Sequence, residues 1–232
     1  MKPILLCAIM FHCSFSQGQN FLYPSIKIDG KELNDFVPTG WKILDTARGD
    51  LNKDGTADAA IILQYNDSVS IKKSGNESVL TQPRILVVLF KAVDGNHFLP
   101  VAQSNSFILN HDNPTMDDPY EETRISNGTL KIKFRLFYNM GSWYVTNTSY
   151  TFRYQQEEFA LIGADYLSFH RATSDFEEYS YNFLTKKRSL KTGNDKHGGT
   201  KTTWKSLNLA TLKTLGTLKE PFTWEVERNI YL

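Results

Sequence analysis

The stretch GDLNKDGTADAAIIL, Gly49 to Leu63, holds the two features that decide the fold. Its second part, Ala59 to Leu63, is a continuous apolar run with the length of a strand that is buried on both faces. Its first part places side-chain oxygens at alternating positions: Asp50, Asn52, Asp54 and Asp58. The sequence therefore predicts a tight polar loop that leads directly into a central strand.

The alternating oxygens favour a calcium loop, because Ca²⁺ takes six to eight hard oxygen ligands from flexible chain. Gly55 permits the sharp turn, since glycine tolerates positive φ. A turn without an ion is the alternative, because Asn, Asp and Gly favour turns by themselves. If calcium binds, a structural role is favoured over a catalytic one, since the loop uses its side chains as ligands. The expected ligands are four side chains and one backbone carbonyl: Asp50, Asn52, Asp54, Asp58 and the carbonyl of Thr56.

The loop is not the calcium site of a helix–loop–helix sensor, because Ile61 stands where that site needs a bidentate Glu. It resembles the strand-flanked calcium loops of the FG-GAP and VCBS repeat families, in which the motif joins strands of a propeller blade. RILVVLF and HFLPVAQ would be the next two strands of such a blade. The resemblance covers roughly residues 41–103 and, since the loop occurs once, it implies one blade-like unit that binds Ca²⁺.

The whole chain also resembles an uncharacterised family of exported Bacteroidetes proteins. The resemblance rests on the segments GDLNKDG, MGSWYVTN, FRYQ and LIGAD. It implies export and carries no activity.

Alternating and apolar runs elsewhere predict a mainly β chain. Arg84 to Lys91 is strongly apolar, and Thr129 to Leu136 alternates apolar with basic residues. The leucines between Leu207 and Leu218 fit a helical face. We expect one domain of antiparallel sheets over residues 17–232, with a blade-like half at 41–103, a second antiparallel half at 104–232, and one or two short helices near the C-terminus.

The first residues, MKPILLCAIMFHCSFS, predict a signal peptide over 1–16 that is cleaved near Ser16 and Gln17, so the protein is expected to be periplasmic or extracellular. Both cysteines, Cys7 and Cys13, lie in it, and the mature chain is then expected to have no disulfide. No other apolar run has the length of a membrane span. Removing Lys2 leaves 25 basic and 25 acidic residues, a balance that argues against a nucleic-acid partner.

The acidic loop, defined here as Asp112 to Glu122, has two interpretations. It could hold a second cation or a carboxylate pair for hydrolysis. It could instead be a solvated loop, which is favoured, and it could face the basic segment between Lys186 and Lys196.

Two further groups also stay open. His170, with Asp165 and Asp175 nearby, could do acid–base work or form only local hydrogen bonds, and the second reading is favoured. An aromatic cluster could line a sugar-binding face or, as is favoured, pack across strands. Its members are Phe137, Tyr138, Trp143, Tyr144, Tyr150, Phe152 and Tyr154.

These observations predict an exported, calcium-stabilised binding or interaction module with a protein or carbohydrate ligand. The alternative is an envelope or extracellular hydrolase, acting on glycans through acids of the acidic loop.

Overall fold

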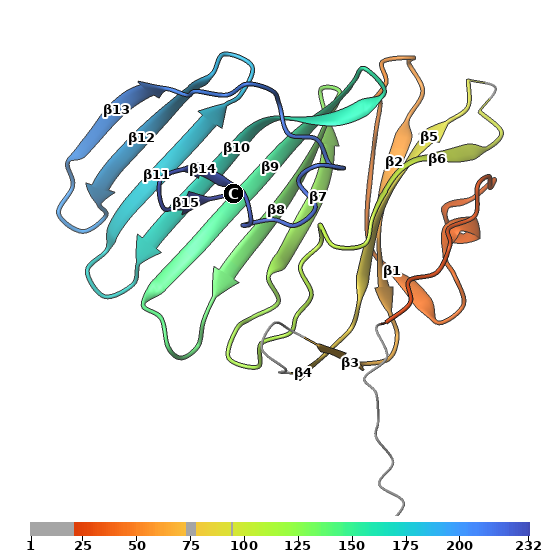
Figure 1. Cartoon of the computed structure of the whole chain (residues 1–232), viewed down its shortest axis with the longest axis horizontal. Helices are drawn as coiled ribbons and strands as arrows, with labels where there is room; N and C mark the ends of the chain where they lie inside the picture. The colour runs from red at the N-terminus through yellow and green to blue at the C-terminus, as the bar shows by residue number, and fades with distance from the viewer. Residues whose placement is uncertain (1–20, 73–77, 94) are drawn as a thin grey trace, which may run out of the picture.

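A computed structural model describes residues 21–72, 78–93 and 95–232. In this part of the chain antiparallel strands form two main sheets and two hairpins (Figure 1), so the prediction of a mainly β, antiparallel fold is confirmed. The helical structure seen there is a single 3-10 turn, η1 (Leu33–Phe36), so the described residues hold no helix with the length and apolarity of a membrane span. The predicted signal peptide, with Cys7 and Cys13, lies outside the described residues.

The first main sheet has four strands in the order β1-β2-β5-β6, each antiparallel to its neighbour. A two-stranded hairpin, β3–β4, is inserted between its second and third strands. The strands and hairpin are β1 (Trp41–Gly49), β2 (Asp58–Tyr65), β3 (Val69–Lys72), β4 (Ser78–Thr81), β5 (Arg84–Lys91) and β6 (Phe98–Ser104). The blade-like interpretation of residues 41–103 stays a prediction.

Strands β2 and β5 are buried on both faces, and the apolar run at Ala59 to Leu63 predicted this for β2. One face contributes Ala60, Ile62, Leu86 and Val88 to the larger core. The opposite face, which includes Ile61 and Val87, packs in a second cluster under η1. Alternation sends successive side chains to opposite faces, so a strand with apolar residues at every position requires cover on both sides.

The second main sheet has seven strands that follow one another in chain order. Figure 1 shows β7 next to the four-stranded sheet and β13 at the far end. The strands are β7 (Tyr120–Ser126), β8 (Thr129–Phe137), β9 (Tyr144–Gln155), β10 (Glu158–His170), β11 (Asp175–Asn182), β12 (Lys187–Asn194) and β13 (Thr200–Ser206).

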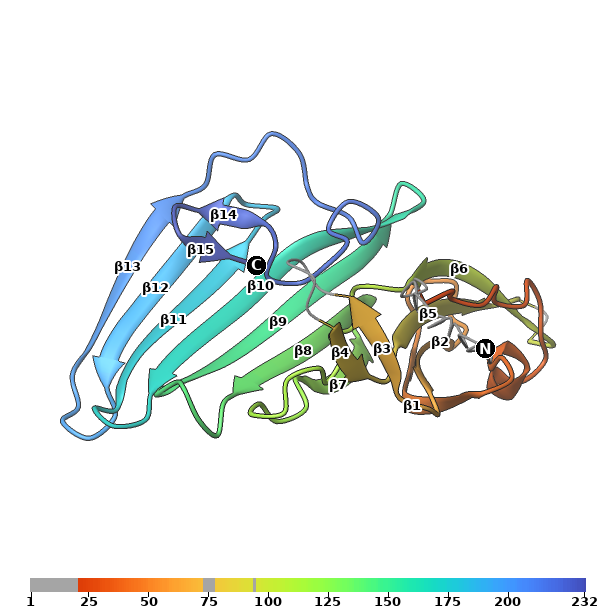
Figure 2. The ribbon, with the colours of Figure 1, turned by 60° about the horizontal axis from the view of Figure 1, so that its bottom comes forward.

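One face of this sheet, called the inner face, carries the aromatic and aliphatic core residues, such as Ile132, Phe152 and Tyr181. The opposite, outer face carries Lys131 and Asp165, which form an ion pair with an Nζ–Oδ2 distance of 3.1 Å. The C-terminal chain crosses the inner face and ends in the hairpin of β14 (Glu225–Glu227) and β15 (Ile230–Tyr231) (Figures 1 and 2).

Residues 207–218 were expected to form a helix, and this prediction is wrong. The leucines do point toward the core, where Leu207, Leu215 and Leu218 are buried. However, the backbone bonds to strand residues: the Leu161 N–H donates to the Lys213 carbonyl at 2.7 Å, and the Leu215 N–H donates to the Phe159 carbonyl at 2.9 Å. The sheet supplies the backbone partners that a helix would have supplied internally.

The two main sheets meet where β1 lies beside β7. A Cβ added to Gly49 would stand 2.6 Å from Cγ2 of Ile125, so the close approach requires glycine there. The Asp45 carboxylate of β1 accepts hydrogen bonds from the Tyr120 hydroxyl and the Thr123 N–H of β7. Burial is the main cause that raises the pKa of Tyr120, and the bond to Asp45 adds to it, so the phenol stays a donor.

Candidate functional site

The loop between β1 and β2 folds around its own carboxylates. The Asp50 carboxylate accepts the N–H groups of Lys53 at 2.6 Å and of Gly55 at 3.0 Å. Gly55 has a φ of +87°, which glycine adopts without strain. Asp54 accepts the Thr56 N–H at 2.7 Å, and this bond, followed by one from the Asn52 amide, lowers the pKa of Asp54.

Asp58 points away from this loop surface and is fully buried. Its Oδ2 accepts the N–H of Leu51 at 2.8 Å and, more weakly, that of Asn52 at 3.4 Å. Its Oδ1 accepts the N–H of Lys91 at 3.0 Å, at the end of β5. Burial raises the pKa of Asp58, while these three N–H groups act in the opposite direction. Asp58 therefore ties the loop to the four-stranded sheet.

The donor set of the loop suits calcium, because its side chains and carbonyls offer hard oxygens. Asp50, Asn52 and Asp54 lie on the accessible side of the loop, with Asp54 fully exposed to solvent. In the described residues no group of three or more His, Cys, Asp or Glu is close enough to hold a metal ion. Calcium binding at Asp50, Asn52, Asp54, Thr56 and Asp58 stays a prediction, and Asp58 would have to exchange backbone bonds to take part.

The acidic loop forms part of the seam between the two sheets. The Arg84 side chain of β5 is only 2% exposed, and both Nη atoms donate to the Asp118 carboxylate. Nη1 of Arg84 also donates to the Leu109 carbonyl at 2.8 Å. Burial acts to raise the pKa of Asp118, but the hydrogen bonds and charge of Arg84 outweigh it, so this pKa lies below its ordinary value.

Other acids of the acidic loop have separate partners. Asp117 accepts the Asn139 amide at 3.3 Å, and Glu122 forms an ion pair with Lys133. Two residues of the basic segment, Arg188 and Lys191, do not pair with this loop. Arg188 bonds to Glu227, and Nζ of Lys191 lies 3.8 Å from the Glu178 carboxylate. The acids thus serve several structural contacts and do not converge on one pocket.

The aromatic cluster divides between core and surface. Tyr150 and Phe152 are fully buried and pack edge-to-face on Phe107, with ring centroids 5.3 Å apart in both pairs. Trp143 and Tyr144 are 64% and 54% exposed. Cross-strand packing is therefore the role of the first pair, whereas the second pair is available at the surface.

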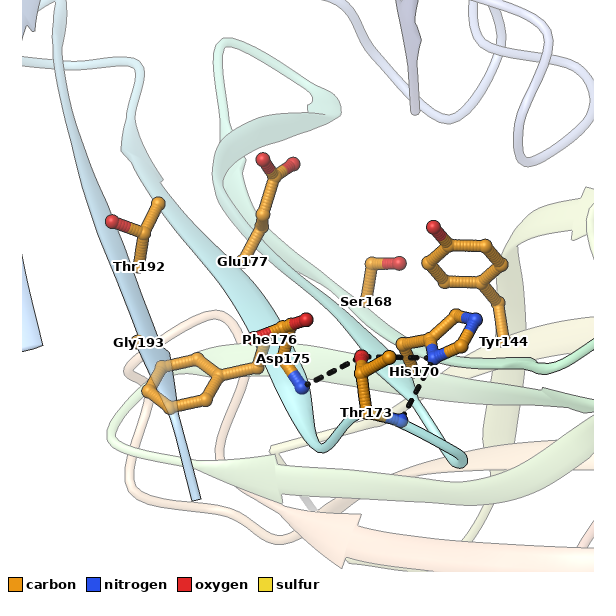
Figure 3. A pocket seen from close by; sticks show the side chains of 9 residues that line it. All are labelled: Tyr144, Ser168, His170, Thr173, Asp175, Phe176, Glu177, Thr192 and Gly193. Carbon is orange, nitrogen blue, oxygen red and sulfur yellow. Dashed lines mark hydrogen bonds between the residues drawn. The ribbon is translucent and has the colours of Figure 1, made fainter. Parts of the chain in front are cut away.

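Tyr144 lines a cavity of about 510 Å³ (Figure 3). This cavity was not predicted from the sequence. It lies at one end of the strands β9 to β12, and several of its lining residues project on the inner face. The residues used below are Tyr144, Ser168, His170, Asp175, Glu177 and Thr192.

Strand register brings these residues together. Tyr144 of β9 pairs with His170 of β10, Ser168 of β10 pairs with Glu177 of β11, and Glu177 pairs with Thr192 of β12. Figure 3 shows the Ser168 hydroxyl and the Glu177 carboxylate projecting on the same side of the sheet. Positions on paired strands are held by backbone bonds, so these side chains start from fixed points.

The His170 ring is oriented by its neighbours. Its Nδ1 accepts the Thr173 N–H at 3.1 Å, which assigns the proton of the neutral ring to Nε2. The Tyr144 ring stands edge-on to it, with centroids 4.8 Å apart and planes at 75°. The arrangement offers one N–H donor and one half-exposed aromatic ring.

Two carboxylates complete the lining. Asp175 accepts the Asn194 amide at 2.7 Å. The Thr173 side chain, then Asn194, lower the pKa of Asp175, so it is ionised at neutral pH. Glu177 accepts a long bond of 3.4 Å from the Tyr179 hydroxyl. Within the described part of the chain, no Lys or Arg lines this cavity.

A second cavity, of about 570 Å³, lies mainly on the outer face and is the larger of the two. Several of its charged groups already have partners. Asp165 accepts hydrogen bonds from Lys131, Ser149 and Ser180, and Lys133 pairs with Glu122 just outside the lining. A ligand there would have to break these bonds. The inner-face cavity is therefore the better candidate site, although it is smaller.

The structure brings only part of the predicted histidine group together. His170 and Asp175 line one cavity, whereas Asp165 projects from the outer face. Ser168, Glu177 and Thr192 were missed by the sequence reasoning. The signal that could have found them is the alternation of β10 and β11, which puts Ser168 and Glu177 on the face of Tyr166 and Tyr179.

Comparisons of this chain with protein-family models, with curated proteins and with solved structures find no match.

Proposed function

We propose that this protein is a calcium-stabilised binding module that takes a small hydroxylated ligand, such as a sugar, in the inner-face cavity. One observation carries the proposal: four paired strands present an accessible aromatic ring, hydroxyls and two carboxylates to the same cavity. Ligand sites of this kind combine an apolar surface with a few placed polar groups. The volume of about 510 Å³ also lies in the usual range for small-molecule sites.

Binding is favoured over the hydrolase alternative. A general acid for glycan hydrolysis needs a pKa raised toward neutral pH. The pKa of Asp175 is lowered, and the acids of the acidic loop have separate structural partners. The acidic groups of the cavity are thus suited to accept hydrogen bonds from a ligand.

The proposal predicts that Tyr144→Ala weakens ligand binding about tenfold, because stacking on this ring buries roughly 60 Å² of apolar surface. Amide shifts of the ¹⁵N-labelled protein would be followed during titration with glucose, glucosamine and glucuronate. At least one of the three is expected to shift the amides of Ser168, His170 and Glu177.

Trp204→Ala is the matched control, since Trp204 is a second exposed aromatic, at 73%, on the edge strand β13. It should leave the binding unchanged. Shifts that avoid the cavity residues for all three sugars, or binding that depends on Trp204 and not on Tyr144, would contradict the proposal.

For the calcium loop, we expect calcium to raise the melting temperature by about 3–6 °C relative to chelator. At ten times the Kd, linkage adds about 1.4 kcal/mol, and 1 kcal/mol corresponds to roughly 2–4 °C in a chain of this size. Thermal denaturation would be measured with and without Ca²⁺. Asp54→Ala should abolish the shift.

Asp35→Ala is the control for this measurement, because Asp35 also accepts two backbone N–H groups at an exposed turn outside the loop. It should keep the full calcium shift. An equal shift in wild type and Asp54→Ala would show that calcium acts elsewhere.

A further inference from the structure

The lining of the inner-face cavity bears on the charge of its ligand. We propose that this cavity takes a hydroxylated ligand with a positive charge, of which an amine-bearing sugar is the simplest example. The inference rests on the proposed function, because it uses the same site and adds the charge of the ligand.

The first argument is the charge of the lining. Asp175 and Glu177 contribute two carboxylates, and the lining residues that the structure describes include no lysine or arginine. Lys191 lies near one lining residue, with its Nζ 5.5 Å from the centroid of the Phe176 ring. The same Nζ lies 3.8 Å from the carboxylate of Glu178. The two carboxylates of the cavity therefore have no cationic side chain within the lining to neutralise them.

The second argument is the orientation of His170. Its Nδ1 accepts the Thr173 N–H at 3.1 Å, so the turn after β10 holds the ring in place. The two lining carboxylates carry a formal charge of about −2.

The third argument is the position of the aromatic ring. Tyr144 is half-exposed at the cavity, and an aromatic face attracts a cation while an aliphatic side chain does not. Ser168 and Thr192 flank Glu177 on the neighbouring strands, so hydroxyl partners stand beside the carboxylate. A ligand with one amine and several hydroxyls matches both kinds of partner.

The test compares three pyranoses that differ in charge: glucosamine, glucose and glucuronate. Dissociation constants would be measured by NMR titration of the whole protein, using the amides of Ser168, His170 and Glu177. Glucosamine should bind about fivefold more tightly than glucose, and glucuronate should bind most weakly, as expected for one exposed ion pair.

Two variants locate the charge effect. Glu177→Gln should weaken glucosamine about fivefold more than it weakens glucose, because the amide keeps a hydrogen-bond acceptor and loses the charge. Glu178→Gln changes the next residue of β11, which projects to the outer face and pairs with Lys191, so it should change neither affinity.

The outcomes separate the two proposals. Equal binding of glucosamine and glucose at the cavity, a preference for glucuronate, or a Glu177→Gln variant that keeps the glucosamine preference would overturn the charge class and leave the binding module standing. Absence of cavity shifts with all three sugars would overturn the binding module and the charge class with it.

Discussion

Asp118→Ala is expected to lower the free energy of unfolding by about 2–4 kcal/mol. The substitution leaves the guanidinium of Arg84 buried, at 2% exposure, without its carboxylate. Breaking a buried ion pair by removing one partner costs about 3–5 kcal/mol, and the half-exposed Asp118 side chain places this case toward the lower end. Urea denaturation at pH 7 should show a lower midpoint with an unchanged m-value.

Asp117→Ala is the control, because it changes the neighbouring acid, whose carboxylate accepts a long bond of 3.3 Å from the Asn139 amide. It should lie within about 0.5 kcal/mol of wild type. If the two variants lose the same stability, the Arg84–Asp118 pair does not hold the seam.

The same pair gives a pH dependence with a defined sign. The folded-state pKa of Asp118 is lowered, so its contribution is present above the unfolded value of about 3.9 and is lost as pH falls through the folded value. The difference in unfolding free energy between wild type and Asp118→Ala should therefore narrow as the pH falls below about 4. A stability difference that does not change as the pH is lowered would mean that the charge of Asp118 does not cause it.

Asp58→Ala is expected to lower the free energy of unfolding by about 2–3 kcal/mol, in chelator as well as in calcium. The change removes the acceptor of three backbone N–H groups at a fully buried position. Leaving buried donors without an acceptor costs about 1–3 kcal/mol for each group, and partial access of water reduces the sum.

Asp58→Asn should cost nearly as much as Asp58→Ala, because one amide oxygen cannot accept N–H groups on both sides of the residue. Asp54→Ala in chelator is the matched control and should keep a denaturation midpoint close to that of wild type, since Asp54 is exposed. Chemical denaturation would separate the two roles. If Asp58→Ala lowers the free energy of unfolding only in the presence of calcium, Asp58 acts as an ion ligand, and its bonds to the backbone N–H groups contribute little.

The strand content of this protein could be read from local patterns. The run from Arg84 to Lys91 forms β5 over the same residues, and Thr129 to Leu136 lies within β8. Burial on both faces at β2 also followed from the uninterrupted apolar run. Such predictions work because hydrophobic alternation is a property of adjacent residues.

The leucines at 207–218 show where local pattern fails. Their spacing fits a helix, yet the chain extends across the inner face and bonds to the end of the β9–β10 pair. The apolar positions were recognised correctly, but the conformation depended on which backbone groups were left unpaired nearby. Tertiary contacts override a weak helical preference in this way.

The sequence by itself determined the mainly β antiparallel fold, the buried strand after the loop and the set of oxygens in GDLNKDGTAD. Only the tertiary structure decided that Asp58 turns inward, that Asp118 belongs to Arg84, and that Ser168, His170 and Glu177 meet in one cavity. The physical reason is the distance along the chain between the residues that interact. Strand periodicity comes from neighbouring residues, whereas a buried charge or a ligand site depends on strand register, which joins residues far apart in the chain.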